Sequence, residues 1–168
     1  MAGTQINLLQ EQLTFCRDET LRIAENVPEP HRLKQLLDGK AHPMWLIGHL
    51  TNTVNTVVVR WTLGERLEMP KGFGRKFAPD FAGGLPITGS AEDYPDWDEV
   101  VSLYRLVMTA AIDGIGKLTD DDLPNPLPGE VPDQLRGFFS SIGRSLSIMV
   151  SHDSYHRGQI GMLSKLPE

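Results

Sequence analysis

The segment AHPMWLIGHLTNTVNTVVV, residues 41–59, is the longest stretch of this chain without a formal charge. Its length approaches the roughly 20 apolar residues that a membrane-spanning helix needs. It nevertheless contains two histidines, two asparagines and three threonines within those positions. That content is too polar for a lipid environment, so the segment is predicted to be a buried helix of a globular domain.

This helix is predicted to begin at Pro43, because the first helical position does not need the N–H that proline lacks. Gly64 is a natural stop. Its core-facing stripe follows the three-four spacing of a helix and consists of Leu46, His49 with Leu50, Thr53, Val57 and Trp61. Many β-branched residues between 51 and 59 weaken intrinsic helicity, so a buried strand within residues 50–60 stays open as an alternative.

Three other segments have the same three-four spacing of apolar residues. The first helix of the chain spans 6–27 and is closed by Pro28 and Pro30. The third helix starts at Asp96, where Glu99 completes a capping-box pattern, and the fourth runs from about Asp133 to Leu166. Four amphipathic helices with almost no strand pattern predict an all-α fold, a four-helix bundle formed by a single domain over residues 1–168.

The connections carry weaker signals. Residues 64–95 form a long crossover rich in glycine and proline, which is either a partly ordered connection or a lid over a site. The acidic triplet 120–122 resembles a cation site, but it lacks the spacing and the glycine of a calcium loop. Solvated loop and helix-cap chemistry is the better interpretation of that triplet.

Composition excludes several classes of function. The 168 residues carry a net charge of −6 with a pI near 5.3, which argues against a general nucleic-acid binder. Cys16 is the only cysteine, so an internal disulfide and a multi-cysteine zinc site are excluded, and its place in the first stripe predicts a core residue. The start of the chain has no secretory pattern, and a cytoplasmic location is expected.

Three histidines interrupt the apolar stripes. His152 and His156 are four residues apart, so on a helix they face the same side and can offer nitrogens to one ion. His49 falls on the buried face of the second helix, and it can meet the pair if the two helices run antiparallel. Asp153 also occupies a stripe position, where a buried polar group must be paired.

Other interpretations of these histidines stay open at this point. They can be core histidines with ordinary hydrogen-bond partners or a pH-sensitive cluster, because a pair at this spacing is weak evidence alone. The zinc-protease pattern His-Glu-x-x-His is absent, since residue 153 is Asp. His31 and His42 lie near proline-bounded helix ends and are predicted to be surface residues.

The motifs Gly48-His49-Leu50 and His152-x-x-x-His156-Arg157-Gly158-Gln159-Ile160, with the length and the four helices, resemble the DinB/YfiT-like superfamily. The resemblance implies a four-helix bundle of up-down-down-up topology, and a three-histidine metal site formed by His49, His152 and His156. It also implies homodimers and, in characterised relatives, transferases and isomerases that use low-molecular-weight thiols such as bacillithiol or mycothiol.

A three-imidazole site leaves coordination positions open, as catalytic zinc sites do. The expected function is therefore a metal-dependent enzyme acting on a small molecule, a thiol-dependent transferase or a hydrolase, with zinc or nickel ahead of iron or manganese. The alternative is a non-catalytic metal-binding or stress-response module whose metal is structural. A third hypothesis is a helical bundle that binds no physiological metal. No nucleic acid or membrane is expected as a partner.

The surroundings of the expected site are less determined. Asp153, Asn52 and Gln159 either orient the imidazoles or the substrate, or are ordinary helix polar residues. Arg157 either reaches a substrate carboxylate or is a solvated charge. The walls of the substrate pocket are expected from the 64–95 segment and the third helix.

Overall fold

The computed structural model describes residues 4–167 and is all-helical over that range, with no strand among them. The all-α prediction is confirmed. The α-helices are α1 (Thr4–Glu25), α2 (Pro43–Val54), α3 (Phe73–Phe77), α4 (Trp97–Ile115), α5 (Asp133–Arg136) and α6 (Ile142–Leu163). Single 3-10 turns lie at Glu29–His31, Asp80–Ala82, Ala91–Asp93 and Asp120–Asp122.

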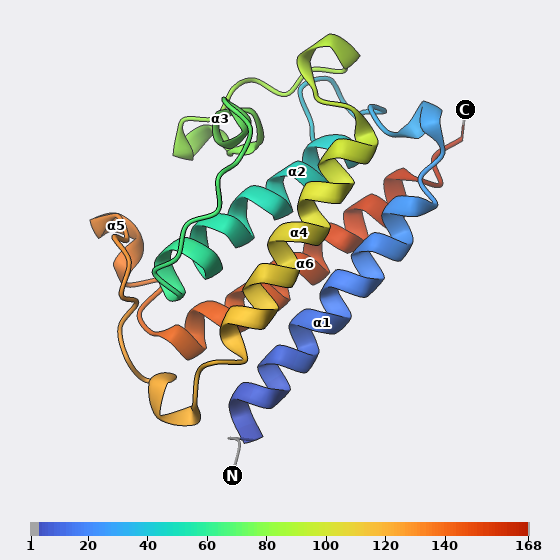
Figure 1. Ribbon diagram of the computed structural model, residues 1–168. Coiled ribbons are helices and arrows are strands. Elements are labelled where there is room, and N and C mark those ends of the chain that lie inside the picture. The colour runs from blue at the N-terminus through green and yellow to red at the C-terminus, as the bar shows by residue number, and fades with distance from the viewer. Residues whose placement is uncertain (1–3, 168) are drawn as a thin grey trace.

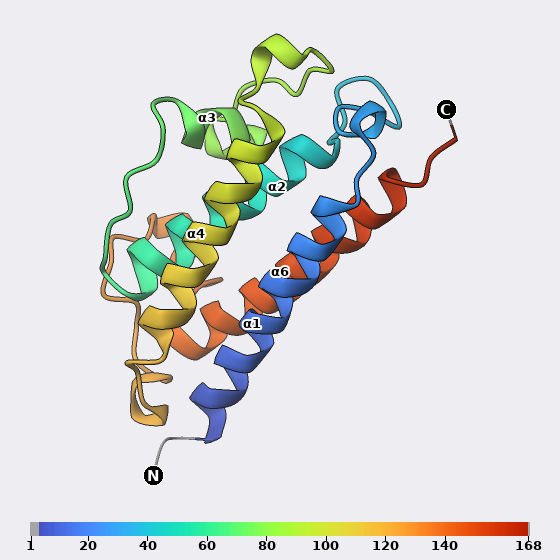
Figure 2. The ribbon, with the colours of Figure 1, turned by 45° about the vertical axis from the view of Figure 1, so that its right-hand side comes forward.

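The four long helices pack side by side around one core (Figures 1 and 2). α1 contacts α4 and α6, and α2 contacts the same two helices. In Figure 1, α1 and α6 ascend from the end near the N-terminus, whereas α2 and α4 descend toward it. The helices α2 and α6 are therefore antiparallel, which is the arrangement that lets His49 approach the His152 pair.

The uncharged segment is helical throughout. α2 begins at Pro43, as predicted, and continues without interruption into a π-helix over Asn55–Thr62. The alternative of a strand within 50–60 is wrong. Leu46, Ile47 and Leu50 are fully buried, so tertiary packing outweighs the low intrinsic helicity of the β-branched residues that follow. The wider π-turn closes with hydrogen bonds such as Leu63 N–H to the Val58 carbonyl.

The acidic triplet 120–122 caps helix ends, as the sequence predicts. Asp120 accepts hydrogen bonds from the Gln5 and Ile6 N–H groups at the start of α1. Asp122 and Thr119 form a reciprocal capping box. The first N–H groups of a helix lack partners within the helix, and the Asp120 carboxylate accepts hydrogen bonds from two of them at the start of α1.

One predicted helix cap and one predicted helix start need correction. Asp96 occupies the N-cap of α4, but its side chain accepts no capping hydrogen bond, because it is exposed and water can solvate the first N–H groups. The last long helix begins at Ile142 and not near Asp133. Ser141 is extended and accepts from the Arg144 N–H, which caps α6 and separates it from the short α5.

The crossover of residues 64–95 is anchored to the core. Phe73 and Phe77 of α3 are buried, and α3 packs on α2. Figure 2 places α3 beside α2, away from α1. The segment is therefore tied to the bundle through α3, and it supplies atoms to the site described below.

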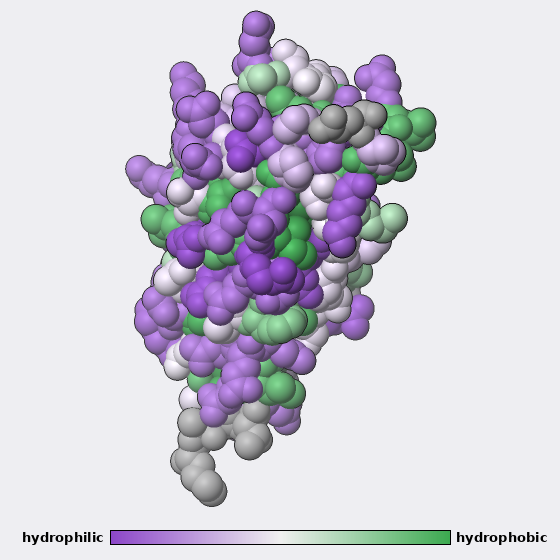
Figure 3. All heavy atoms as spheres, turned by 90° about the vertical axis from the view of Figure 1, so that its right-hand side faces the viewer, coloured by the Kyte–Doolittle hydropathy of each residue, from purple (hydrophilic) through white to green (hydrophobic). Residues whose placement is uncertain are grey.

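No helix within residues 4–167 is long and apolar enough to cross a membrane. The face in Figure 3, seen from the right-hand side of Figure 1, is mainly hydrophilic, with apolar side chains in separate patches.

Candidate metal centre

The three predicted histidines meet in space. His49 lies on α2, and His152 and His156 lie one turn apart on α6. The Nε2 atom of His152 lies 3.2 Å from Nε2 of His49 and 3.1 Å from Nε2 of His156. One nitrogen from each ring lies within 4.8 Å of the others. Antiparallel helices and the four-residue spacing thus bring three ring nitrogens to one point.

The orientation of His49 is set by the crossover segment. Its Nδ1 lies 3.0 Å from the Phe77 carbonyl oxygen, so Nδ1 carries the proton and Nε2 keeps a lone pair. Gly48 makes this contact geometrically feasible. A Cβ at position 48 would lie 2.2 Å from the Phe77 ring, so only glycine lets α3 approach α2 this closely.

The orientation of His156 is set within α6. Its Nδ1 lies 2.6 Å from Oε1 of Gln159, which is three residues further along the helix. The amide oxygen accepts the Nδ1 proton, so the lone pair of Nε2 points toward His152. Gln159 therefore has the orienting role that the sequence left open, and Phe77 is a second orienting group that the sequence did not reveal, because a backbone carbonyl leaves no motif.

His152 completes the arrangement. Its Nδ1 is buried and has no hydrogen-bond partner within the described chain. If its Nε2 carries the proton, it can donate to only one of two facing lone pairs; if Nδ1 carries it, three lone pairs face one another. Neither tautomer satisfies the cluster, whereas one divalent cation would accept all three lone pairs.

The spacing also fits a metal ion. Metal–nitrogen bonds of about 2.0–2.1 Å, held at 90–110°, would separate neighbouring nitrogens by roughly 2.8–3.4 Å. The two Nε2 distances of 3.2 and 3.1 Å fall in that interval, and the ligand nitrogens of the third pair, His49 and His156, lie within 4.8 Å of each other. The residues present therefore fit a divalent metal ion.

The electrostatics keep the three rings neutral. Burial lowers the pKa of His49 to about 4, against the opposing hydrogen bond to Phe77. Burial, and then the two neighbouring rings, lowers the pKa of His152 to about 3. Burial also lowers the pKa of His156. Near neutral pH the lone pairs are consequently free of protons, which is the state that metal ligation requires.

A cavity of about 520 Å³ opens beside the cluster. Its lining comes from α2 and its π-helical extension, from residues 78–82, from α5 and the residues after it, and from α6: Trp45, His49, Asn52, Thr53, Thr56, Val57, Trp61, Ala78, Pro79, Phe81, Ala82, Leu135, Phe138, Phe139, Ile148, Met149, His152 and His156. The expected contribution of the 64–95 segment is confirmed. The expected contribution of the third helix is wrong, because no residue of α4 lines this cavity.

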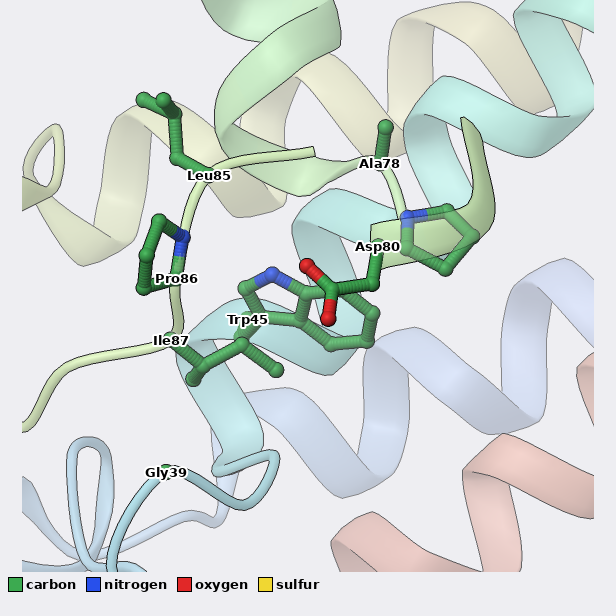
Figure 4. Close-up of a pocket in the computed structure, with 8 residues that line it drawn as sticks. Gly39, Trp45, Ala78, Asp80, Leu85, Pro86 and Ile87 are labelled. Atoms are coloured by element: carbon green, nitrogen blue, oxygen red, sulfur yellow. The ribbon is translucent and has the colours of Figure 1, made fainter. Parts of the chain in front are cut away.

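Trp45 forms a wall between this cavity and a second one. Its indole stacks on the His49 ring, with centroids 4.7 Å apart and planes 9° from parallel. On its other side lies a cavity of about 350 Å³, where Figure 4 shows Trp45 among Asp80, Pro86 and Ile87. The indole Nε1 is buried without a hydrogen-bond partner in the described chain.

Asp153 does not contact the imidazoles. It is buried and accepts hydrogen bonds from Tyr104 Oη at 2.6 Å, Thr20 Oγ1 at 3.0 Å and Arg157 at 3.2 Å. Burial raises the pKa of Asp153, and these donors oppose the increase. The acid therefore ties α1 and α4 to α6, and Arg157 pairs with it instead of reaching a ligand or the solvent.

Two other groups lie away from the cluster. Asn52 lines the cavity but bonds to no histidine; its amide lies 3.5 Å from the Gly74 carbonyl. Cys16 is buried in the core, as predicted, with Sγ 3.8 Å from the Val150 carbonyl, and burial raises its pKa. It does not line the cavity, so this thiol is not a nucleophile for the site.

The prediction that His31 and His42 are surface residues is wrong. His42 is fully buried at the N-cap of α2, where its Nδ1 accepts from the Trp45 N–H and its Nε2 donates to the Thr88 carbonyl. His31 is also buried, and its Nδ1 lies 2.9 Å from the Ser164 carbonyl. Both rings satisfy backbone groups at chain ends and loops that pack together only in the folded protein.

Comparison with known proteins identifies the family of the chain. No curated protein matches the chain significantly. Residues 12–160 match the family described as the DinB superfamily, and that range contains all three histidines and all four long helices in whole or in large part. The chain therefore belongs to the DinB superfamily.

Proposed function

We propose that this protein is a metal-dependent enzyme that holds one divalent ion through Nε2 of His49, His152 and His156 and acts on a small molecule in the adjoining cavity. The observation that carries the proposal is the convergence of three lone pairs that no tautomer can satisfy. Zinc or nickel is the expected ion, because imidazole ligands suit both metals, and iron or manganese is the next candidate. In this proposal the four helices form the up-down-down-up bundle of the superfamily.

The chain's own groups have defined roles. Phe77 and Gln159 accept the Nδ1 protons of His49 and His156, so that both rings present Nε2 to the same point. The stack of Trp45 on His49 limits rotation of that ring and excludes water from one side. When bound, a divalent metal would lower the pKa of a water or thiol and so supply a nucleophile near neutral pH.

The reaction is either hydrolysis or transfer to a low-molecular-weight thiol. The thiol in the second case comes from outside the chain, because Cys16 is buried away from the cavity. The open cavity beside the three nitrogens favours a catalytic ion over a purely structural one, since a structural site is normally closed by a fourth protein ligand. The cytoplasmic location and the homodimer stay predictions.

Metal analysis of protein purified without a polyhistidine tag tests the site. We expect about one equivalent of a transition metal, and less than about 0.2 equivalents after His49→Ala. His42→Asn is the matched control, because it removes a buried histidine outside the cluster. A wild-type protein with less metal than this threshold, unchanged by His49→Ala, would contradict the proposal.

Catalysis needs a separate test. Metal-loaded protein is assayed for ester hydrolysis and for thiol conjugation, and the activity is expected to vanish in His152→Ala while the helical circular dichroism is retained. A structural ion is the second candidate, because the ligands bridge α2 and α6. It predicts that metal removal lowers the melting temperature and that no substrate in either assay is turned over.

A further inference from the structure

The cavity beside the histidines has an unusual lining for a site that handles metabolites. Apart from the three histidines, none of its lining residues within the described range carries an ionisable side chain. The polar groups are Asn52, Thr53 and Thr56, all on the α2 side. The other side chains are aliphatic or aromatic, so the cavity offers polar contacts along one helix and hydrocarbon elsewhere.

Aromatic rings form a continuous series along one part of the lining. Trp61 contacts Phe139 edge-to-face at 5.6 Å, and Phe139 contacts Phe138 in the same way at 4.9 Å. The series begins at a buried ring and ends at Phe138, which is 52% exposed. Phe81, from the crossover segment, lines the same cavity and is 85% exposed. Two exposed rings from separate segments thus border an apolar space, and both would lose contact with water when a ligand fills it.

We infer that the substrate of this site, if the proposed function holds, is a predominantly apolar small molecule that places one polar group at the metal position between the histidines and an uncharged hydrocarbon body against the aromatic series. A negative charge away from the metal position is disfavoured, because it would be desolvated against a lining that has no lysine or arginine. The inference also restricts a thiol co-substrate: any carboxylate that does not reach the metal position must stay outside the cavity.

A matched pair of dyes tests this inference. N-phenyl-1-naphthylamine is neutral, and 1-anilinonaphthalene-8-sulfonate has the same ring skeleton with one negative charge. Fluorescence titration of the metal-free protein is expected to give tighter binding of the neutral dye, by about tenfold or more, because burial of an unpaired charge is costly. Equal or tighter binding of the sulfonate would overturn the inference.

Two substitutions locate the dye. Phe138→Ala should weaken binding of the neutral dye several-fold, because it removes a rim ring. Thr56→Lys should weaken the neutral dye and strengthen the sulfonate, since it adds a cation to the wall. The control position is Leu106 on α4, which is half exposed and does not line the cavity. Leu106→Ala and Leu106→Lys should leave both affinities unchanged, and an effect of these controls equal to that of the cavity variants would contradict the assignment.

Failure of the apolar-pocket inference can be distinguished from failure of the proposed metalloenzyme function. Dye binding is measured without metal, and His49→Ala should retain the preference for the neutral dye. Absence of bound metal in the wild-type protein, with this preference intact, would overturn the metalloenzyme and leave the apolar pocket. Full metal occupancy without any preference would overturn the pocket assignment and leave the metal site.

Discussion

The Nδ1 of His49 lies 3.0 Å from the carbonyl oxygen of Phe77, 28 residues further along the chain. This hydrogen bond joins a helix of the core to a long crossover, and it fixes which nitrogen of the ring faces the metal position. It depends on Gly48, because the Phe77 ring occupies the space that any side chain at position 48 would need.

Gly48→Ala is expected to disturb both stability and metal binding. The added methyl group would overlap the Phe77 ring, which should lower the free energy of unfolding by about 1–3 kcal/mol. Displacement of the Phe77 carbonyl should weaken metal affinity by about 10–100-fold. Isothermal titration of metal into the apo-protein and urea unfolding measure the two effects.

Gly158→Ala is the control for that substitution. It lies on α6 between the ligands and Gln159, and nothing lies within 4 Å of an added Cβ. Alanine should leave metal affinity unchanged and raise stability by up to about 1 kcal/mol, because it favours the helix. If both glycine variants behave alike, the close approach of Phe77 is not what positions His49.

Gln159→Leu should weaken metal binding without unfolding the protein. The substitution removes the acceptor that lies 2.6 Å from Nδ1 of His156 and keeps a side chain of similar size. We expect a loss of metal affinity of about 10–100-fold. Met162→Leu, an exposed position on the same helix, should have no effect. Unchanged affinity in Gln159→Leu would show that the ring of His156 is oriented by its helix alone.

Asp153→Ala is expected to be among the most destabilising substitutions in the chain. The carboxylate is 1% exposed and receives hydrogen bonds from Tyr104, Thr20 and Arg157. Its removal would leave the Arg157 charge and a buried Tyr104 hydroxyl unpaired, at a cost of about 3–5 kcal/mol. Chemical denaturation measures this loss. Asp133→Ala, which breaks an exposed ion pair, should change stability by less than about 0.5 kcal/mol.

The stability of the metal-free protein should fall as the pH decreases from about 6.5 toward 4. Burial lowers the pKa of His42 from 6.5 to about 4 in the folded protein. Between these values the unfolded chain binds a proton that the folded protein does not bind, so acid favours unfolding. Above pH 6.5 the ring is neutral in both states and this loss is absent.

A His42→Asn variant isolates the contribution of this residue. Asparagine can still cap α2 but does not titrate. Relative to the wild type, its loss of stability between pH 7 and pH 4.5 should be smaller by about 2.4 kcal/mol, as the pKa values of 6.5 and about 4 imply. Urea unfolding at the two pH values measures the difference. An identical loss in both proteins would mean that protonation of His42 does not couple to folding.

Much of this fold could be predicted from the sequence because helical periodicity is local. The starts of α2 and α4 follow from Pro43 and Asp96, and the buried stripes of α1, α2 and α4 follow from three-four spacing. The break before α6 was not predicted, because apolar spacing continues through residues 135–139 while Ser141 caps a new helix. One capping hydrogen bond is enough to start a new helix at this point, and the spacing of apolar residues does not indicate it.

The sequence by itself determined the four long helices, the same-face placement of His152 and His156, and the position of His49 on a buried face, since all three depend on spacing along one helix. Only the tertiary structure decided that the three Nε2 atoms converge and that a Phe77 carbonyl, not a side chain, orients His49. It also decided that His42 is buried and that the cavity is lined by residues 135–139 instead of α4. These features depend on contacts between segments that are distant in the chain, and no local pattern of residues encodes such distances.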